Sequence, residues 1–179
     1  MNIPKRIILT GPESTGKTTL AKHLAYHLTT AVVHEYARDY ISSLNRPYTT
    51  ADILNIAKGQ IEWERQGMQL ANKYVICDTS MLVLKVWSEY KFGICPPFIL
   101  EELKYQKIDL FVLCGIDVPW EFDQLRENPN ERQKLYEIYK KELTEGGFHF
   151  IEVSGSVEDR INQIKGELQI WNKDYIQNS

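Results

Sequence analysis

The sequence predicts an α/β fold in which a five-stranded, mainly parallel sheet lies between helical layers. The first observation behind this prediction is that short apolar runs alternate along the chain with longer segments of helical periodicity. The second is that the apolar runs show little polar alternation, which is typical of strands covered on both faces. Strands that alternate with helices imply crossover connections and therefore parallel pairing.

The predicted strands are rich in Ile, Val, Leu and Phe, and they comprise residues 6–10, 31–34, 74–78, 110–116 and 148–153. The predicted helices comprise residues 17–28, 51–72, 81–90, 97–106, 131–144 and 157–171. The first of these helices carries Leu20, Leu24 and Leu28 on one stripe, and Ser156 is a candidate N-cap for the last. The chain therefore offers about five strands and five or six helices.

The bulk properties are those of an ordinary globular protein. With 179 residues, of which 43% are hydrophobic, we expect a single domain over residues 1–179 with a substantial core. The net charge of −3 argues against broad binding of nucleic acid through its phosphates. The apolar run before Gly11 is too short for a signal peptide or a membrane span.

The cysteines indicate a reducing compartment. Cys77, Cys95 and Cys114 have no CxxC spacing, and Cys77 and Cys114 lie in apolar runs, which favours buried, reduced thiols. We therefore expect a cytoplasmic protein that binds neither nucleic acid nor a membrane. The sequence carries no indication of the oligomeric state.

Residues 11–18 read GPESTGKT and match the phosphate-binding pattern G-x-x-x-x-G-K-[ST] in full, between a predicted strand and a predicted helix. Backbone N–H groups of such a loop and the positive end of the following helix bind phosphate oxygens. Lys17 is expected to reach the β- and γ-phosphates of ATP, and Thr18 to offer its hydroxyl to Mg²⁺. The sequence therefore predicts the P-loop NTPase/kinase fold. The expected ATP-binding residues are Gly11, Glu13, Ser14, Thr15, Gly16, Lys17, Thr18, Thr19 and, after the last strand, Ser154.

A P-loop does not by itself define what accepts the γ-phosphate. Water accepts it in switches and motors, and a small-molecule hydroxyl accepts it in kinases. The small number of predicted elements favours a compact small-molecule kinase. A nucleotide-dependent switch or binding ATPase remains an alternative, although the chain has no guanine-reading N-K-x-D stretch.

Two carboxylates follow predicted strands. Glu35 lies in HEYARDY (residues 34–40), after the second strand, and Asp78 ends the third. Ligands of open α/β sheets bind beyond the carboxyl ends of the strands, so we expect both side chains at one site. Asp78 is the candidate for Mg²⁺ or its water network, and Glu35 for the acceptor hydroxyl, although the roles are interchangeable at this stage. The alternative is that each acid caps a following helix.

The segment after the fourth strand is polar and is expected to form a small lid, approximately residues 120–133. Such segments close over the phosphates and supply arginines to the transition state, so Arg126 and Arg132 are candidate catalytic residues. The alternative for each is a solvated helix residue. Trp120 is a candidate for stacking on an aromatic base, although a large aromatic residue is more often core or hinge packing.

Five stretches occur together in an order and spacing that resemble one family. They are GPESTGKTTL, HEYARDY, IAKGQ at residues 56–60, ICDTS at residues 76–80 and DVPWEFDQLR at residues 117–126. The chain resembles the ribosylnicotinamide kinase domain of NadR-type NAD-biosynthesis proteins, a P-loop kinase, over about residues 5–168. Lys17 and Thr18 would serve ATP and Mg²⁺ on that resemblance.

The resemblance implies ATP-dependent phosphorylation of the ribose 5′-hydroxyl of nicotinamide riboside to nicotinamide mononucleotide. It places Glu35, Tyr36, Arg38 and Asp78 in the acceptor pocket, Trp120 near the base and Arg126 in the lid. Another nucleoside or a nucleotide is the alternative acceptor. NadR proteins carry an adenylyltransferase domain before the kinase, and this sequence starts at the P-loop strand. We therefore expect it neither to regulate transcription nor to make NAD from the mononucleotide.

Overall fold

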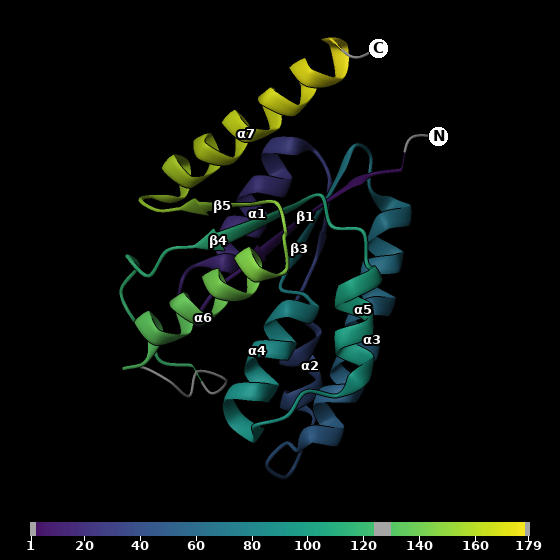
Figure 1. Cartoon of the computed structure of the whole chain (residues 1–179), viewed down its shortest axis with the longest axis vertical. Helices are drawn as coiled ribbons and strands as arrows, with labels where there is room; N and C mark the ends of the chain where they lie inside the picture. The colour runs from purple at the N-terminus through teal and green to yellow at the C-terminus, as the bar shows by residue number, and fades with distance from the viewer. Residues whose placement is uncertain (1–2, 124–129, 178–179) are drawn as a thin grey trace.

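The computed structural model describes residues 3–123 and 130–177 (Figure 1). One sheet runs through the molecule, with the strand order β2-β3-β1-β4-β5. Each neighbouring pair is parallel, which confirms the predicted five-stranded parallel sheet. The strands are β1 (Lys5–Thr10), β2 (Ala31–Val33), β3 (Tyr74–Asp78), β4 (Leu110–Cys114) and β5 (Phe150–Val153).

Helices cover both faces of the sheet, as predicted. The described helices are α1 (Lys17–Leu28), α2 (Tyr36–Ser42), α3 (Thr50–Leu70), α4 (Met81–Phe92), α5 (Pro97–Tyr105), α6 (Arg132–Glu145) and α7 (Val157–Gln177). Helices α1 and α7 lie on one face, and α2 to α6 lie on the other (Figure 1). Within the described ranges, none of these helices combines the length and apolar character that crossing a bilayer requires.

The central strands are buried on both faces because successive side chains point to opposite sides of a strand. In β1, Ile7 and Leu9 belong to the core shared with α1 and α7, whereas Ile8 belongs to the core shared with α2 to α6. This double burial explains the continuous apolar runs of the sequence. It also buries the free thiols of Cys77 and Cys114, as expected, while Cys95 is partly buried.

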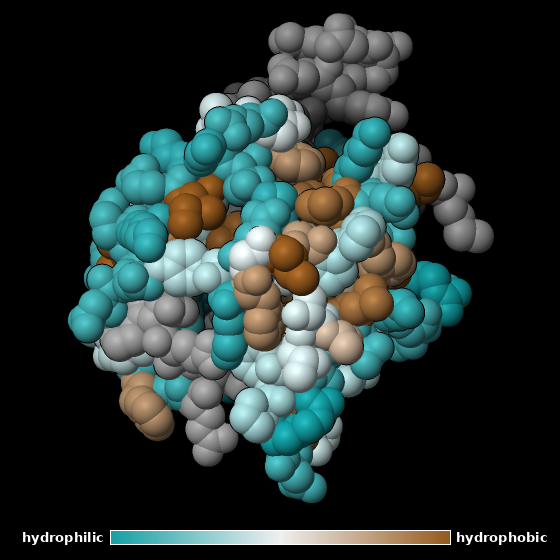
Figure 2. All heavy atoms as spheres, turned by 60° about the horizontal axis from the view of Figure 1, so that its bottom comes forward, coloured by the Kyte–Doolittle hydropathy of each residue, from teal (hydrophilic) through white to brown (hydrophobic). Residues whose placement is uncertain are grey.

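The face of the molecule in Figure 2 carries both hydrophilic and apolar side chains. Isolated exposed apolar side chains are common on folded proteins, so they do not by themselves indicate a binding surface. The large exposed apolar side chains of the described residues are Ile3, Tyr26, Leu70, Ile94, Leu100, Tyr105 and Phe122.

Helix α2 was absent from the sequence prediction. Its seven residues, YARDYIS, bury only Ala37 and carry no extended apolar stripe. So short a helix is not stable by its own propensity and depends on packing. The packing comes from α3, to which α2 is joined by aromatic and hydrogen-bonded contacts. Most other element ends lie within about two residues of the prediction, but α7 continues to Gln177.

A buried carboxylate lies where α3 meets β1. Glu64 is 1% exposed and lies 3.7 Å from Nε of Arg6. The amide of Gln106 donates a hydrogen bond to the same carboxylate. Burial raises the pKa of Glu64 to about 7, against the lowering effect of Arg6.

This raised pKa predicts a stability that falls with rising pH. Because the folded state holds the proton of Glu64 more tightly than the unfolded state, the stabilisation is complete below the ordinary pKa of 4.5 and is lost as the pH rises through about 7. We expect the free energy of unfolding to decline more between pH 4.5 and 7 in the wild type than in Glu64→Gln. Urea denaturation across this range measures the difference. Parallel pH profiles for the two proteins would contradict the prediction.

Candidate active site

A cavity of about 250 Å³ lies at the carboxyl ends of β1 and β3. One wall is the P-loop, whose Gly11 and Gly16 have φ angles of 123° and 78°. At Gly11, a Cβ atom would lie 3.0 Å from the carbonyl oxygen of Cys114, so the loop packs directly on β4. Pro12 lines the cavity, and so do all the predicted ATP-binding residues of this stretch, which are Gly11, Glu13, Ser14, Thr15, Gly16, Lys17, Thr18 and Thr19.

Internal hydrogen bonds shape the P-loop. The Thr15 hydroxyl donates to the carbonyl of Pro12 at 2.9 Å. The Lys17 ammonium donates to the carbonyls of Gly11 and Pro12, at 2.9 and 2.6 Å. Helix α1 begins at Lys17 with no acidic residue in its first turn, so its positive end faces the cavity unopposed by its own side chains. This arrangement suits phosphate.

Glu35 and Asp78 line the same cavity, so the structure brings the two predicted carboxylates together. Burial raises the pKa of Glu35, the charge of Asp78 raises it further, and Lys17 and Arg38 lower it. Burial also raises the pKa of Asp78, against a hydrogen bond from Thr18 and the charge of Lys17. Asp78 is 2% exposed, and within the described part of the chain its Oδ1 atom has no hydrogen-bond partner.

Arg38 and Tyr36 lie close to Glu35 in the sequence, but only Arg38 lines the cavity. Arg38 lines the cavity and pairs with Asp123, at 2.9 Å, so that α2 is joined to the segment after β4. The ring of Tyr36 lies instead against α3, where it meets Trp63 edge to face with the ring centroids 4.9 Å apart. Tyr36 is not among the residues that line the cavity.

A further part of the cavity lining is apolar and partly aromatic, and the sequence analysis missed it. Helices α4 and α6 supply it, with Trp87 held by a hydrogen bond from its indole N–H to the Tyr48 hydroxyl at 2.9 Å. The α4 residues of this wall have the spacing of apolar residues that pack a helix against the core. The sequence therefore did not distinguish residues that line a cavity from residues of the core. The residues of this apolar wall are Val83, Val86, Trp87, Tyr90, Leu135 and Tyr139.

Arg132 lies at the start of α6 and is tied to backbone carbonyls. Its guanidinium donates to Ser14 at 3.1 Å and to Val118 at 2.8 Å, and also to Ile116. These bonds fasten the P-loop to the segment after β4. Arg126 lies outside the described residues.

Trp120 and Ser154 are the remaining predicted site residues. Trp120 is half-buried, whereas Val118 and Glu121 are the members of its segment that line the cavity. The backbone N–H and C=O of Ser154 both bond to the side chain of Gln163, at 3.3 and 2.9 Å. This pairing fixes the loop between β5 and α7.

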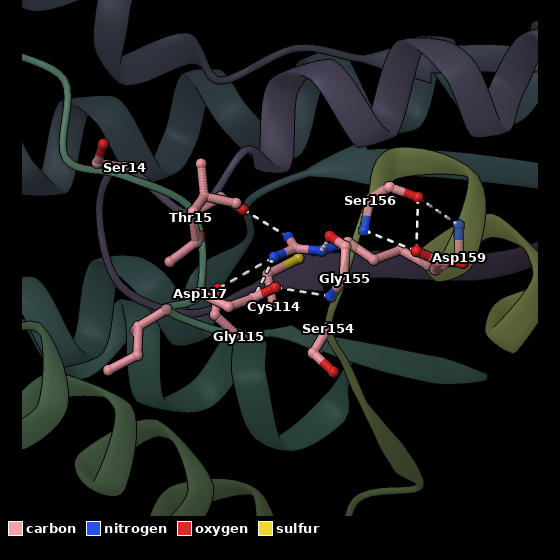
Figure 3. A network of polar contacts seen from close by, with 12 residues as sticks. Ser14, Thr15, Cys114, Gly115, Asp117, Ser154, Gly155, Ser156 and Asp159 are labelled. Carbon is pink, nitrogen blue, oxygen red and sulfur yellow. Dashed lines mark hydrogen bonds and ion pairs between the residues drawn. The ribbon is translucent and has the colours of Figure 1, made fainter.

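A buried arginine, Arg160 of α7, binds the backbone of the P-loop. Its guanidinium donates to the carbonyl of Thr15 at 2.6 Å and to Asp117 at 2.7 Å, and its side chain is 2% exposed. Asp117 also accepts a hydrogen bond from the N–H of Gly155 at 2.6 Å, so three segments meet here (Figure 3). The sequence analysis missed Arg160. A signal was present, because Arg160 lies in the apolar stripe of α7 with Ile161 and Ile164.

The chain is similar in sequence and in fold to known proteins. A family profile described as an AAA domain matches residues 6–160, which include the P-loop, Glu35, Asp78 and Arg160. The chain belongs to this AAA domain family. The curated relatives of this family member include the trifunctional NAD biosynthesis/regulator proteins NadR of Escherichia coli and Salmonella typhimurium, each 27% identical over 157 residues. The match covers 83% of this chain and 38% of each relative, so the chain spans about two fifths of their length.

Solved structures show that this AAA domain family member shares the fold of P-loop kinases. A crystal structure of NadR protein in complex with NR has a TM-score of 0.74 at 22% identity, covering 86% of this chain and 45% of that one. A deoxyadenosine kinase from M. mycoides has a TM-score of 0.64 at 14% identity, covering 92% and 98%. These likenesses, together with the curated relatives, confirm the predicted fold and the resemblance to NadR.

The Arg160 contacts predict a large loss of stability on truncation. In Arg160→Ala, the carbonyl of Thr15 loses this donor, the carboxylate of Asp117 loses its ion pair and keeps the N–H of Gly155, and a cavity opens beside the P-loop. We expect the free energy of unfolding to fall by about 2–4 kcal/mol, measured by urea denaturation. Arg65→Ala is the matched control, because Arg65 is exposed and pairs only with Glu62 of its own helix in the described contacts. Equal losses in the two variants would contradict the prediction.

Proposed function

We propose that the chain is an ATP-dependent kinase that phosphorylates the ribose 5′-hydroxyl of nicotinamide riboside to give nicotinamide mononucleotide. The observation that carries the proposal is that a P-loop, the Glu35 carboxylate and an apolar, partly aromatic wall face one cavity. The likeness to NadR in complex with NR supports this choice of acceptor. We propose further that residues 1–179 form one kinase domain that works in the cytoplasm. Its lid would comprise approximately residues 120–133, of which 124–129 lie outside the described residues.

The acceptor would lie between the apolar wall and Glu35. A flat base packs well against aromatic side chains, which Trp87 and Tyr90 offer. Glu35 would accept the proton of the attacking hydroxyl, and its raised pKa brings it closer to the neutral range in which a general base works best. Arg38 also lines the cavity and places a positive charge near Glu35.

The donor would lie on the P-loop. The acceptor oxygen forms a bond to the γ-phosphorus as the bond to the β-phosphate oxygen breaks, which leaves ADP. Lys17 and the start of α1 would hold the phosphate charge, and Arg132 would keep the loop in shape through its carbonyl contacts.

The residues of the site fit Mg²⁺. Thr18 and Asp78 meet at the cavity, and the free oxygen of Asp78 is of the ligand type that Mg²⁺ prefers. The described residues contain no group of three or more His, Cys, Asp or Glu side chains that would hold a metal alone. A Mg²⁺ ion here would therefore be held by Thr18, Asp78, water and phosphate, where it would neutralise charge on the nucleotide.

A nucleoside panel tests the proposal directly. With Mg·ATP, we expect nicotinamide riboside to stimulate ADP formation above all other acceptors, and Lys17→Ala to abolish this turnover without unfolding the protein. A different nucleoside or a nucleotide as the best acceptor would keep the kinase chemistry and replace the substrate. ADP formation that no acceptor stimulates would remove the kinase and favour a nucleotide-dependent switch or binding ATPase.

The role of Glu35 predicts a specific loss of rate. Because Glu35→Gln cannot take up the proton, we expect kcat to fall by about 10²–10⁴-fold. In the wild type, kcat should rise with pH as Glu35 ionises, at a pH above the ordinary range of a glutamate since its pKa is raised. Steady-state kinetics across pH measure both. A loss of less than about tenfold would assign the proton transfer to Asp78 instead.

A further inference from the structure

Glu35 occupies the N-cap position of α2, and its carboxylate makes no capping hydrogen bond there. The first N–H groups of a helix have no partner within the helix and need an acceptor from elsewhere. A polar side chain at the N-cap position is the usual acceptor. Another group must therefore accept hydrogen bonds from the start of α2 if Glu35 is to face the cavity.

Gln60 of α3 supplies an acceptor for the first of these N–H groups. Its side-chain oxygen accepts a hydrogen bond from the backbone N–H of Tyr36, the first residue of α2, at 2.9 Å. Gln60 is only 2% exposed, so its side chain is held by its surroundings. Helix α3 thus caps α2 from outside.

Gly59 makes this approach possible. A Cβ atom at Gly59 would lie 2.1 Å from a ring carbon of Tyr36, so the ring lies directly on the backbone of α3. Trp63, one turn further along α3, meets the same ring edge to face. Gly59 and Gln60 are the last two residues of the IAKGQ stretch, which the proposed reaction leaves without a role.

We propose that Gln60 is a positioning residue: by capping α2 in place of Glu35, it leaves the Glu35 carboxylate free to face the cavity. Gly59 permits the contact by letting the Tyr36 ring lie on α3. The inference rests on the proposed function, because it assigns Gln60 to the general base of that reaction. Without the Gln60 oxygen, the N–H groups at the start of α2 draw the Glu35 carboxylate back toward their own helix, away from the acceptor hydroxyl.

The test removes the acceptor while keeping the side chain's size. We expect Gln60→Met to lower kcat by about 10²-fold, since misplacing a catalytic group by about 1 Å has this effect, and to leave the KM for ATP nearly unchanged. Gln60→Glu keeps an acceptor oxygen and should retain more activity than Gln60→Met. Tyr40→Phe is the matched control. It removes the 3.1 Å bond from the Tyr40 hydroxyl to Asp52, also between α2 and α3, and should keep kcat within about twofold.

A double-mutant cycle separates positioning from a general structural role. If Gln60 acts through Glu35, Gln60→Met in a Glu35→Gln background causes no further loss of kcat. Losses that multiply in the double variant, or an unchanged kcat in Gln60→Met, would overturn the inference.

An NMR titration of Glu35 gives a readout that does not need turnover. In Gln60→Met, hydrogen bonds from backbone N–H groups stabilise the ionised Glu35, so its pKa falls below that of the wild type. An unchanged pKa would overturn the inference. Absence of acceptor-stimulated turnover in the wild type would refute the proposed function instead, and the titration would still decide whether Gln60 controls the position of Glu35.

Discussion

The carboxylates of Glu35 and Asp78 are buried at one cavity, and both interact with the charge of Lys17. The rest of the site depends on this balance of charge. Burial raises the pKa of both Glu35 and Asp78, and the charge of Lys17 opposes it in both. The strand order puts β1 between β3 and β4, with β2 beyond β3, so the loop that carries Lys17 and the two acids meet at one edge of the sheet. The charge of the P-loop lysine therefore offsets part of the effect of burial on both acids.

The sheet, the P-loop and the two acids could be predicted because each produces a pattern of neighbouring residues in the sequence. A strand covered on both faces reads as an unbroken apolar run, as β3 does before Asp78. The glycines of the P-loop are required by backbone angles and by the close approach to Cys114, so their spacing is a strong signal. Parallel strands end at one edge, which was enough to expect Glu35 and Asp78 together.

The remaining features depend on contacts between segments far apart in sequence. Helix α2 exists because α3 holds it, and no pattern within its seven residues indicates that. The buried Arg160 is stabilised by the carbonyl of Thr15, which lies 145 positions away. The family resemblance predicted Tyr36 in the acceptor pocket, and the polar segment predicted Arg132 in the lid. The structure shows the Tyr36 ring against Trp63 and the Arg132 guanidinium at backbone carbonyls, and the direction of each side chain is set by packing that the sequence does not display.

The ion pair between Arg38 and Asp123 has a consequence for how the molecule responds to salt. It joins α2 to the segment after β4, and the Arg38 side chain is 47% exposed. Exposed pairs are weakened by dissolved salt, whereas groups deep in a cavity are screened much less. Dissolved salt would therefore weaken the contact between α2 and the segment after β4 more than it weakens the interactions of Asp78, which is only 2% exposed. The outer and inner parts of this edge of the sheet would respond differently to the ionic strength of the solvent.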